Sequence, residues 1–505
     1  MQKKLRIRIL FLASLLVGST FMLAVPPVAP QDTNVKLTLL QINDVYEITP
    51  VSSGKEGGMA RLATLRQQLA RQNPNTFMLL AGDLVSPSAL GTAVVDGERL
   101  AGKQMISVLN AVGLNYCTFG NHEFDLREQP FLQRLAESKF KWFASNAFDR
   151  QQKPFPNVAE NIVFTVTNAA NQQARVGLFG VMLTKNKPDY VAYTDPLAAA
   201  QKQVQALRDQ VDILIAVTHL QLDEDIKLAQ TVPGIDLILG GHEHENVQVW
   251  RGPNFTPILK ADANTRSAYI HDLTFDTETR RLQITSRLQI INDKIPEDAA
   301  VGQVVQSWVD QAFNAFRKMG FEPGKLVVNS PITLDGREST VRNYPGKLTD
   351  IIVEGFLNAT PGAELAIFNG GSVRIDDELL PGNISEYDVI RILPFGGNVV
   401  AGEMRGRLLQ QILEQGVANK GTGGFLHAAN VAWNTASNVW LINGKPLDQR
   451  RNYKVAISDF LLTGNEQGLS FLSSKNADLK VLNENVIEVR RALMAQLQKT
   501  FGQPQ

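Results

Sequence analysis

The stretch Gly120-Asn121-His122-Glu123-Phe124-Asp125 directly follows an apolar run from Leu114 to Phe119. Continuous apolar runs of this length are typical of strands that are buried on both faces of a sheet. The stretch itself holds an amide that can bind a metal, then a histidine, and a carboxylate three residues further on. We therefore expect a metal ligand beside a pair of proton-handling side chains at the end of a buried strand.

Four other apolar runs also end in polar clusters. Helix-like stretches such as 59–72 and 104–112 lie between several of them, and this repetition predicts a mainly parallel sheet covered by helices on both sides. In such sheets ligands gather beyond the carboxyl ends of the strands. The runs are 37–42 before Asn43-Asp44-Val45-Tyr46, 77–80 before Ala81-Gly82-Asp83, 213–217 before Thr218-His219, and 235–239 before Gly240-Gly241-His242-Glu243-His244.

The histidines indicate that these clusters converge on one site. Four of the six histidines lie at the strand ends, whereas His271 and His427 suit a surface or core position. The side chains offer oxygen and nitrogen ligands without thiolate, which suits Zn, Mn, Fe or Mg. Two metals about 3.5–4 Å apart that share a carboxylate form the usual clamp for displacement at phosphorus. The candidate ligands for such a phosphate-ester hydrolase are Asp44, Asp83, Asn121, His219, His242 and His244.

In their order along the chain, these motifs resemble those of the calcineurin-type metallophosphoesterases. The fuller form at 120–125 is similar to the 5′-nucleotidase branch, which includes periplasmic UDP-sugar hydrolases. The resemblance implies a four-layer α/β/β/α metallophosphoesterase domain followed by a smaller α+β nucleotide-binding domain. It also implies two divalent metal ions, drawn from Zn, Mn, Mg, Fe and Co.

The resemblance further assigns a role to each candidate residue. His122, steered by Asp125, would stabilise the transition state or protonate the leaving oxygen, while a metal-activated water attacks. In the implied ligand set Asp44 and His244 hold one metal, Asp83 bridges, and Asn121, His219 and His242 hold the second.

The first motif departs from the family, because Asp-x-His is replaced by Asp44-Val45-Tyr46. A phenol can bind a strongly acidic metal, but it binds Zn or Mn less readily than imidazole does. Tyr46 is therefore either a ligand or a side chain that packs beside the site and leaves its place to water. Both interpretations stay open.

The second half of the chain holds a candidate nucleotide site. Asn369-Gly370-Gly371-Ser372-Val373-Arg374 combines glycines, which allow close backbone approach, with an arginine suited to phosphate, although Asn-Gly-Gly is also an ordinary turn. Phe395 and Phe460 lie in glycine-containing loops, where they either sandwich a base or plug the domain edge.

These segments resemble the C-terminal nucleotide-binding domain of 5′-nucleotidases. The resemblance implies that Asn369 and Arg374 hold substrate and that Phe395 and Phe460 clamp the base. Glu466 stands where the family usually has an aspartate that contacts the ribose. Arg337 and Arg342 lie where the family keeps phosphate-binding arginines, and a role as ordinary surface charge competes for both.

Length and patterning predict the domain organisation. The 505 residues exceed one ordinary core. An alternating pattern at 273–291 is followed by helical spacing from Val301 to Phe316, which predicts a linking helix. We expect a signal peptide and spacer at 1–30, a metallophosphoesterase domain at 35–295, the linking helix at 296–322, and a substrate-binding domain at 323–500.

Charge and the N-terminus bear on location and partners. Lys3, Lys4, Arg6 and Arg8 precede an apolar stretch at 9–25, as in a secretory signal, with an uncleaved anchor as the alternative. We therefore expect an exported protein, periplasmic or extracellular, with no membrane span beyond this signal. The net charge of zero argues against nucleic acid as a partner. The lone Cys117 excludes an internal disulfide and suits a buried apolar position.

Two classes of function follow. The first is an exported phosphohydrolase acting on nucleoside 5′-monophosphates, with nucleotide sugars, cyclic nucleotides and other small phosphate esters as alternative substrates. The second is a non-catalytic nucleotide-binding protein whose metal site has decayed, with Tyr46 as the first sign. Hydrolysis is favoured because only one expected ligand position differs and both His122 and Asp125 are present.

Overall fold

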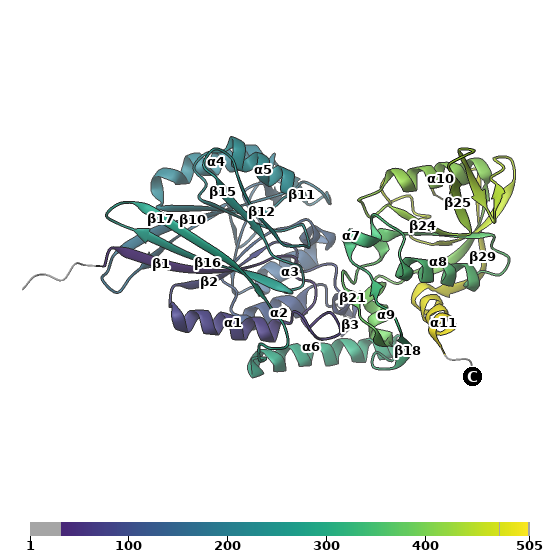
Figure 1. Cartoon of the computed structure of the whole chain (residues 1–505), viewed down its shortest axis with the longest axis horizontal. Helices are drawn as coiled ribbons and strands as arrows, with labels where there is room; N and C mark the ends of the chain where they lie inside the picture. Colours follow the sequence, from purple (N-terminus) through teal and green to yellow (C-terminus); the bar gives the residue numbers. More distant parts are fainter. Residues whose placement is uncertain (1–31, 474, 503–505) are drawn as a thin grey trace, which may run out of the picture.

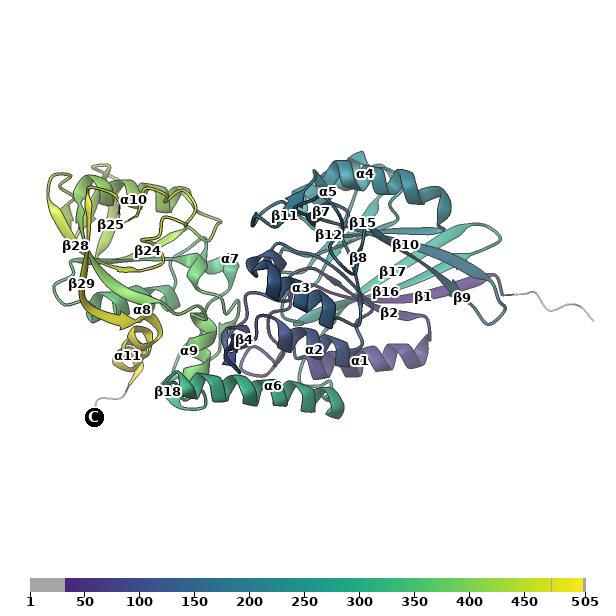
Figure 2. The same cartoon turned by 180° about the vertical axis from the view of Figure 1, so that it is seen from behind.

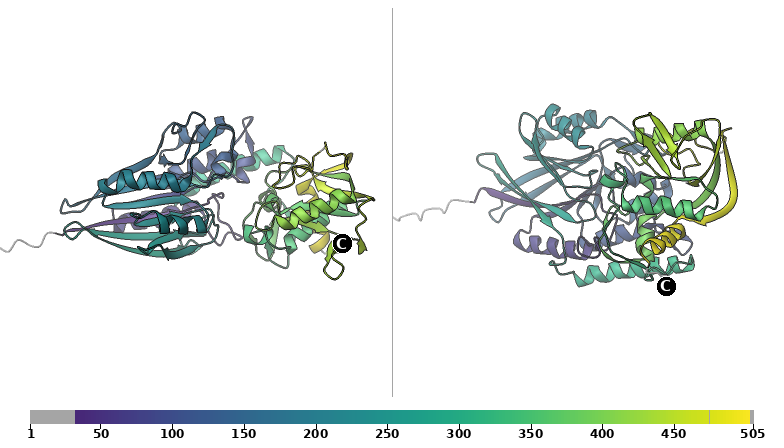
Figure 3. Two further views of the ribbon diagram at one scale, coloured as in Figure 1. Left: turned by 90° about the horizontal axis from the view of Figure 1, so that it is seen from above. Right: turned by 45° about the vertical axis from the view of Figure 1, so that its right-hand side comes forward.

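The computed structural model describes residues 32–473 and 475–502, so the predicted signal peptide at 1–30 lies outside the described residues. Two domains lie side by side along the long axis of the molecule (Figures 1 and 3). Helix α6 (Ala299–Lys318) runs beneath the first domain toward the second. Within the described residues we find no helix that is long and apolar enough to span a membrane.

The first domain contains two sheets, each with parallel strands at its centre and antiparallel strands at an edge. The first sheet has the order β17 (Arg281–Ile290), β16 (Ser267–Asp276), β1 (Asn34–Ile42), β2 (Thr76–Ala81), β5 (Tyr116–Thr118), β6 (Lys141–Phe143) and β8 (Val158–Ala159). The second has the order β14 (Val247–Arg251), β15 (Thr256–Lys260), β13 (Leu237–Gly240), β12 (Ile213–His219), β10 (Gln173–Met182) and β9 (Asn161–Thr167).

The two sheets pack against each other, and helices cover only their outer faces. Apolar side chains of both sheets share one core, which includes Leu39, Leu79, Val176 and Ile215. The helices lie on opposite sides of this sandwich (Figures 1 and 2). One group is α1 (Met59–Gln72), α2 (Lys103–Val112) and α3 (Glu128–Glu137), and the other is α4 (Pro196–Leu207) and α5 (Leu222–Thr231).

This arrangement corrects the expectation, drawn from the strand–helix repetition alone, of one sheet with helices on both sides. The apolar runs were correctly read as buried on both faces, but one of those faces is covered by a second sheet. A hydrophobic run predicts that a strand is buried, but it does not predict whether a helix or a second sheet covers the strand. The four layers implied by the family resemblance are present.

The helix between the domains is part of the first domain's core. Val301, Val305, Ala312 and Phe316 on α6 are buried among residues of α1 and α2. The helical spacing thus predicted the element correctly, and its apolar stripe faces the first domain. The second domain is therefore attached to the first through helix α6, which is itself packed against the first domain.

The second domain is built on a mixed five-stranded sheet. Alternate residues of its strand β20 (Leu365–Asn369) enter two cores, Leu365 and Ile367 on one face and Ala366 and Phe368 on the other. Helix α10 (Gly406–Ala418) covers the first face, while α8 (Lys347–Ala359) and α11 (Val489–Phe501) cover the second. The strand order is β24 (Leu426–Ala429), β20, β28 (Asn452–Ser458), β23 (Asn398–Arg405) and β29 (Leu479–Glu488).

Candidate metal centre and substrate cleft

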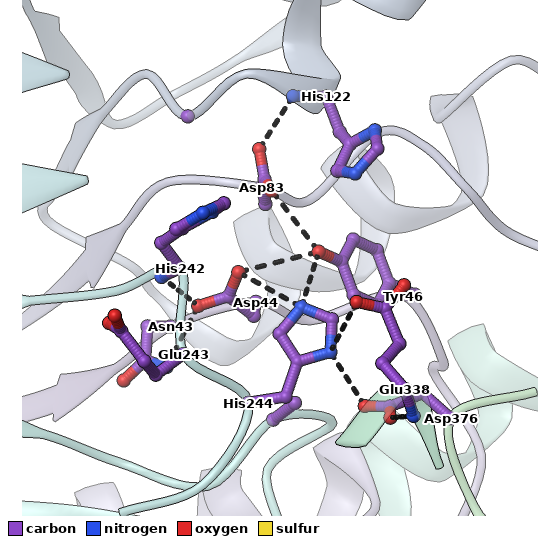
Figure 4. Close-up of polar contacts among 12 residues, drawn as sticks. Asn43, Asp44, Tyr46, Asp83, His122, His242, Glu243, His244, Glu338 and Asp376 are labelled. Atoms are coloured by element: carbon purple, nitrogen blue, oxygen red, sulfur yellow. Dashed lines mark hydrogen bonds and ion pairs between the residues drawn. The ribbon is translucent and has the colours of Figure 1, made fainter. Parts of the chain in front are cut away.

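The polar strand ends of both sheets meet at one place (Figure 4). Asp44 and Asp83 follow β1 and β2 in the first sheet, whereas His219 ends β12 in the second. The carboxylates of Asp44 and Asp83 and the imidazole of His219 form a buried group whose candidate ligand atoms all lie within 4.8 Å of one another. Convergence of residues 175 positions apart in the sequence thus depends on the packing of one sheet on the other.

The backbone at three of these strand ends adopts the left-handed conformation, with φ values of 52° at Asp44, 61° at Asp83 and 82° at His242. Non-glycine residues rarely adopt it, and it costs on the order of 1–3 kcal/mol per residue. Packing is equally tight, because a Cβ on Gly120 would lie 2.2 Å from Asp83 Oδ1. The strand ends therefore carry strain that places their side chains at a common centre.

The charges of the centre suit a cation. His219 Nε2 lies 3.1 Å from Asp83 Oδ2 and 3.9 Å from Asp44 Oδ1. Burial opposes protonation of His219, but Asp83 and Asp44 outweigh it and raise its pKa to about 9. A positive charge is thus favoured among these carboxylates. A divalent cation would supply that charge with the oxygen and nitrogen ligands that such ions bind.

Two further candidate ligands border this group. His242 lies with its ring centre 5.3 Å from that of His219, and burial and the His219 charge lower its pKa to about 2, so it keeps the neutral form that binds metal. Asn121 Oδ1 is buried and has no hydrogen-bond partner among the described residues. An orphaned buried carbonyl is costly unless something binds it, so the residues present fit a metal here.

Tyr46 lies inside the centre. Its hydroxyl is 3.2 Å from Asp83 Oδ2, 3.3 Å from Asp44 Oδ1 and 3.3 Å from His244 Nε2. Burial, followed by the Asp83 charge, raises the pKa of the phenol, so Tyr46 is a neutral hydrogen-bond donor at neutral pH. The phenol oxygen thus lies within hydrogen-bond distance of both carboxylates and of His244, which suits a ligand or a hydrogen-bonding neighbour of the ligands.

The His122–Asp125 pair predicted from the hexapeptide is present. The two residues begin and end a short 3₁₀ turn, and His122 Nδ1 lies 2.6 Å from Asp125 Oδ2. Ser86 Oγ and Asn186 Nδ2 donate to the Asp125 carboxylate at 3.0 and 2.7 Å. Burial opposes protonation of His122, yet Asp125 and then Asp83 raise its pKa. The ring is therefore oriented through Nδ1, and Nε2 is left for a substrate.

Glu123 plays a part that sequence reasoning missed. Its carboxylate accepts hydrogen bonds from the backbone N–H groups of Gly120, Asp83 and Leu84, at 2.6, 3.0 and 2.8 Å. It thereby joins the loop after β5 to the loop after β2. Burial, with Asp83 next, raises its pKa to about 7. Its position inside the hexapeptide could have indicated a role at the site. Its hydrogen-bond partners, however, are backbone N–H groups, which a pattern of side chains does not predict.

The predicted substrate residues of the second domain also lie at neighbouring strand ends. Asn369 ends β20 and donates to Glu466 at 2.7 Å. Phe460 follows β28 and Phe395 precedes its neighbour β23, and the two loops are joined by a 2.9 Å hydrogen bond from Asp459 N to Asn398 O. Phe395 and Phe460 are 53% and 43% exposed. Exposed rings at one sheet edge suit a base clamp better than a plug of the domain edge.

Arg374 connects this edge to the metal centre. Its guanidinium carbon lies 5.7 Å from the centre of the Phe395 ring, and its charge acts on His122 and Asp125 in the other domain. Nε and Nη1 are buried and have no hydrogen-bond partner within the part of the chain that the structure describes. Buried guanidinium donors of this kind suit a bound anion.

The other two arginines are held closely by carboxylates, and Arg374 itself lies 3.7 Å from Glu338 through Nη1. Arg337 pairs with Asp335 at 2.7 Å and Glu378 at 3.1 Å, which supports a structural role. Arg342 pairs with Glu338 beside an interdomain cleft of about 320 Å³. The remaining histidines are core residues, since His271 bonds to Gln41 and Ser286, and His427 to a backbone carbonyl.

Comparisons with known proteins agree with this architecture. Residues 37–246 match the family of calcineurin-like phosphoesterases, and residues 327–473 match the 5′-nucleotidase C-terminal domain. The chain is 24% identical to the 5′-nucleotidase of Mus musculus over 92% of this chain and 90% of that protein. It is 25% identical to the trifunctional nucleotide phosphoesterase protein of Bacillus subtilis over 83% of this chain and 30% of that protein. The solved 5′-nucleotidase precursor from Thermus thermophilus has the same fold, with a TM-score of 0.75 at 23% identity, over 92% of this chain and 97% of that one.

Proposed function

This chain belongs to the 5′-nucleotidase family of calcineurin-like phosphoesterases and is a metal-dependent phosphohydrolase, and we propose that it removes the phosphate from nucleoside 5′-monophosphates. The proposal rests mainly on the environment of Arg374. This residue of the nucleotidase domain has two buried guanidinium nitrogens without a hydrogen-bond partner among the described residues, its charge acts on His122 and Asp125, and it lies next to an exposed phenylalanine, with Glu338 as an ion-pair partner at 3.7 Å. A phosphate held by Arg374 would therefore lie beside His122 with its nucleoside directed toward Phe395.

The metal-binding residues of the proposal are those predicted from the strand ends. Asp44 and His244 would hold one divalent ion, Asp83 would bridge, and Asn121, His219 and His242 would hold a second. When bound, such ions polarise the phosphoryl oxygens and activate a water as the nucleophile. Zn, Mn, Mg, Fe and Co all suit these ligands, and Tyr46 is either a further ligand or a hydrogen-bonding neighbour.

The protonation step is assigned to His122. Asp125 accepts from Nδ1–H and fixes the ring, so that the proton on Nε2 is available to the oxygen of the departing nucleoside. Asp125 also favours the charged imidazolium, which is the form that can donate. Asn186 and Ser86 hold the carboxylate and thereby keep the ring in place.

Substrate recognition is assigned to the edge of the second sheet. Phe395 and Phe460 would stack on the base, while Asn369 and Glu466 would meet polar groups of the nucleoside, with Glu466 near the ribose. Arg342 would help to hold phosphate once its pairing with Glu338 is exchanged for substrate. The domain limits predicted from the sequence, and export to the periplasm or the extracellular space, belong to the same proposal.

A screen of phosphate release tests this function. Purified mature protein, supplied in turn with Mn, Zn, Mg and Co, is offered nucleoside monophosphates, nucleotide sugars, cyclic nucleotides and an aryl phosphate. We expect the highest kcat/KM for a nucleoside 5′-monophosphate. Preference for a nucleotide sugar or a cyclic nucleotide would replace the substrate assignment, and absence of turnover under every condition would favour a nucleotide-binding protein without catalysis.

A further inference from the structure

One candidate metal ligand is held by a residue of the other domain. His244 directs Nε2 toward Asp44 Oδ1, at 3.5 Å, and its Nδ1 lies 2.7 Å from Asp376 Oδ2 (Figure 4). His244 follows β13 in the metallophosphoesterase domain, whereas Asp376 follows β20 in the nucleotidase domain. The imidazole therefore bridges the metal centre and the second domain.

The Asp376 carboxylate is placed there by the structure around it. Asp376 is 4% exposed, and its neighbour Ile375 is buried in the core of the second domain. Its φ of 40° is left-handed, a conformation that a non-glycine residue rarely adopts. The backbone N–H of Glu338 donates to Asp376 Oδ1 at 2.9 Å, while Oδ2 faces the imidazole at 2.7 Å and Arg266 Nη2 at 3.9 Å. Strained backbone, burial and hydrogen bonding thus combine to aim this carboxylate at His244.

The next residue, Asp377, fastens the same segment to another loop of the first domain. Asp377 accepts from the backbone N–H and hydroxyl of Ser52, at 2.9 and 3.1 Å, and pairs with Arg391 at 3.0 Å. Arg391 in turn faces Glu47 at 3.6 Å. Ser52 and Glu47 belong to the loop that leaves the metal centre after Tyr46. Two consecutive aspartates of the second domain therefore contact two different segments of the first domain, His244 and the loop that follows Tyr46.

From this geometry we infer that Asp376 is a positioning residue for the metal centre, supplied across the domain boundary, which holds His244 with Nε2 toward the metal. The inference rests on the proposed role of His244 as a ligand. A carboxylate on the distal nitrogen of a ligating imidazole fixes its tautomer and orientation and makes it a better ligand. The carboxylate and the imidazole lie in different domains, so their contact couples metal affinity to domain placement. If this placement of the domains raises the metal affinity by some factor, bound metal raises the equilibrium constant for this placement by the same factor.

The experiment compares metal affinities of full-length variants. Chelator-treated wild type, Asp376→Asn, Asp376→Ala and His244→Ala are titrated with Mn²⁺ by calorimetry, and thermal unfolding checks that each variant is folded. Asp377→Asn is the matched control, since it lies in the same segment and the same interface without touching the imidazole. We expect the binding event that is weakened by His244→Ala to be weakened about 10–100-fold by Asp376→Asn, and less by Asp377→Asn.

Two further measurements separate positioning from a general structural effect. In the His244→Ala background, Asp376→Asn should change the Mn²⁺ affinity by less than about twofold, because the carboxylate acts only through the imidazole. The visible spectrum of bound Co²⁺, which reports ligand geometry, should change with Asp376→Asn and stay unchanged with Asp377→Asn. Equal losses of affinity for both aspartate variants, or additive effects with His244→Ala, would overturn the inference.

The outcome for His244 itself distinguishes this inference from the proposed function. If His244→Ala leaves Mn²⁺ binding unchanged, the proposed ligand set is wrong. If His244→Ala weakens binding and Asp376→Asn does not, the ligand set stands and only the role of Asp376 fails.

Discussion

The metal centre of the first domain and the substrate edge of the second domain are built differently. On the metal side, Asp44, Asp83 and His219 are at most 1% exposed and interlocked by hydrogen bonds and strained backbone. On the nucleotide side, Phe395 and Phe460 are about half exposed. The first surface is preorganised for chemistry, whereas the second keeps apolar area available for a ligand to cover. Changes on the metal side should therefore alter turnover, and changes on the nucleotide side should alter selectivity.

The largest effect is expected from His122→Ala. Removal of a positioned general acid should lower kcat by about 10²–10⁴-fold, while the metal content stays near that of wild type, because His122 lies outside the proposed ligand set. Metal analysis and steady-state kinetics check this outcome. Asp125→Asn, which keeps the ring but weakens its orientation, should lower kcat less. Loss of metal together with activity would make His122 a ligand and refute the assigned role.

Substitutions of Tyr46 test the one position where the metal side departs from its family. Tyr46→His should bind Zn²⁺ and Mn²⁺ more tightly by tenfold or more, since even the outer partners of metal ligands change affinity by about 10–100-fold. Tyr46→Phe distinguishes the two interpretations of the native residue. A loss of affinity in Tyr46→Phe well beyond the roughly 10–100-fold effect of an outer partner identifies the phenol as a ligand, and a loss within that range or no loss identifies it as a hydrogen-bonding neighbour. Competition with a chelator of known affinity measures both variants.

On the nucleotide side, Phe460→Ala should raise KM for nucleotides by roughly tenfold, because stacking of a base on an aromatic ring contributes about 1–3 kcal/mol. KM for an aryl phosphate, which lacks the base, should change little. Kinetics on both substrates with the same enzyme preparation provide the comparison. An equal rise in KM for both substrates would show that Phe460 supports the domain edge and does not clamp a base.

The smallest effect concerns a histidine of the metal domain that lies outside the site. Burial lowers the pKa of His271 to about 3, so the folded protein keeps this ring neutral while the unfolded chain protonates it near its ordinary pKa of about 6.5. Stability is therefore lost as the pH falls from 6.5 toward 3, by about 1.4 kcal/mol per pH unit from this group. His271→Gln should flatten that slope in denaturant unfolding measured between pH 6.5 and 4.5. An unchanged slope would assign the acid sensitivity to other groups.

Most residues of the candidate metal centre could be predicted from the sequence alone. Ligand-type side chains follow apolar runs directly, and the ends of parallel strands meet at one edge, so local order along the chain already predicted that Asp44, Asp83 and His219 converge. The helix at 299–318 was equally predictable, because its apolar residues recur with helical spacing. Both inferences need only the order of the elements along the chain and the spacing of apolar residues within each element.

Only the tertiary structure shows which distant segments those elements contact. Periodicity showed that strands are buried but could not show that a second sheet covers them, and it could not pair His244 with Asp376, which lies 132 positions further along the chain. The left-handed backbone at Asp44, Asp83 and His242 was also unpredictable, since Asp and His adopt it more often than other non-glycine residues but still only in a small minority of cases. Such features depend on packing between distant segments, which stabilises conformations that the local sequence disfavours.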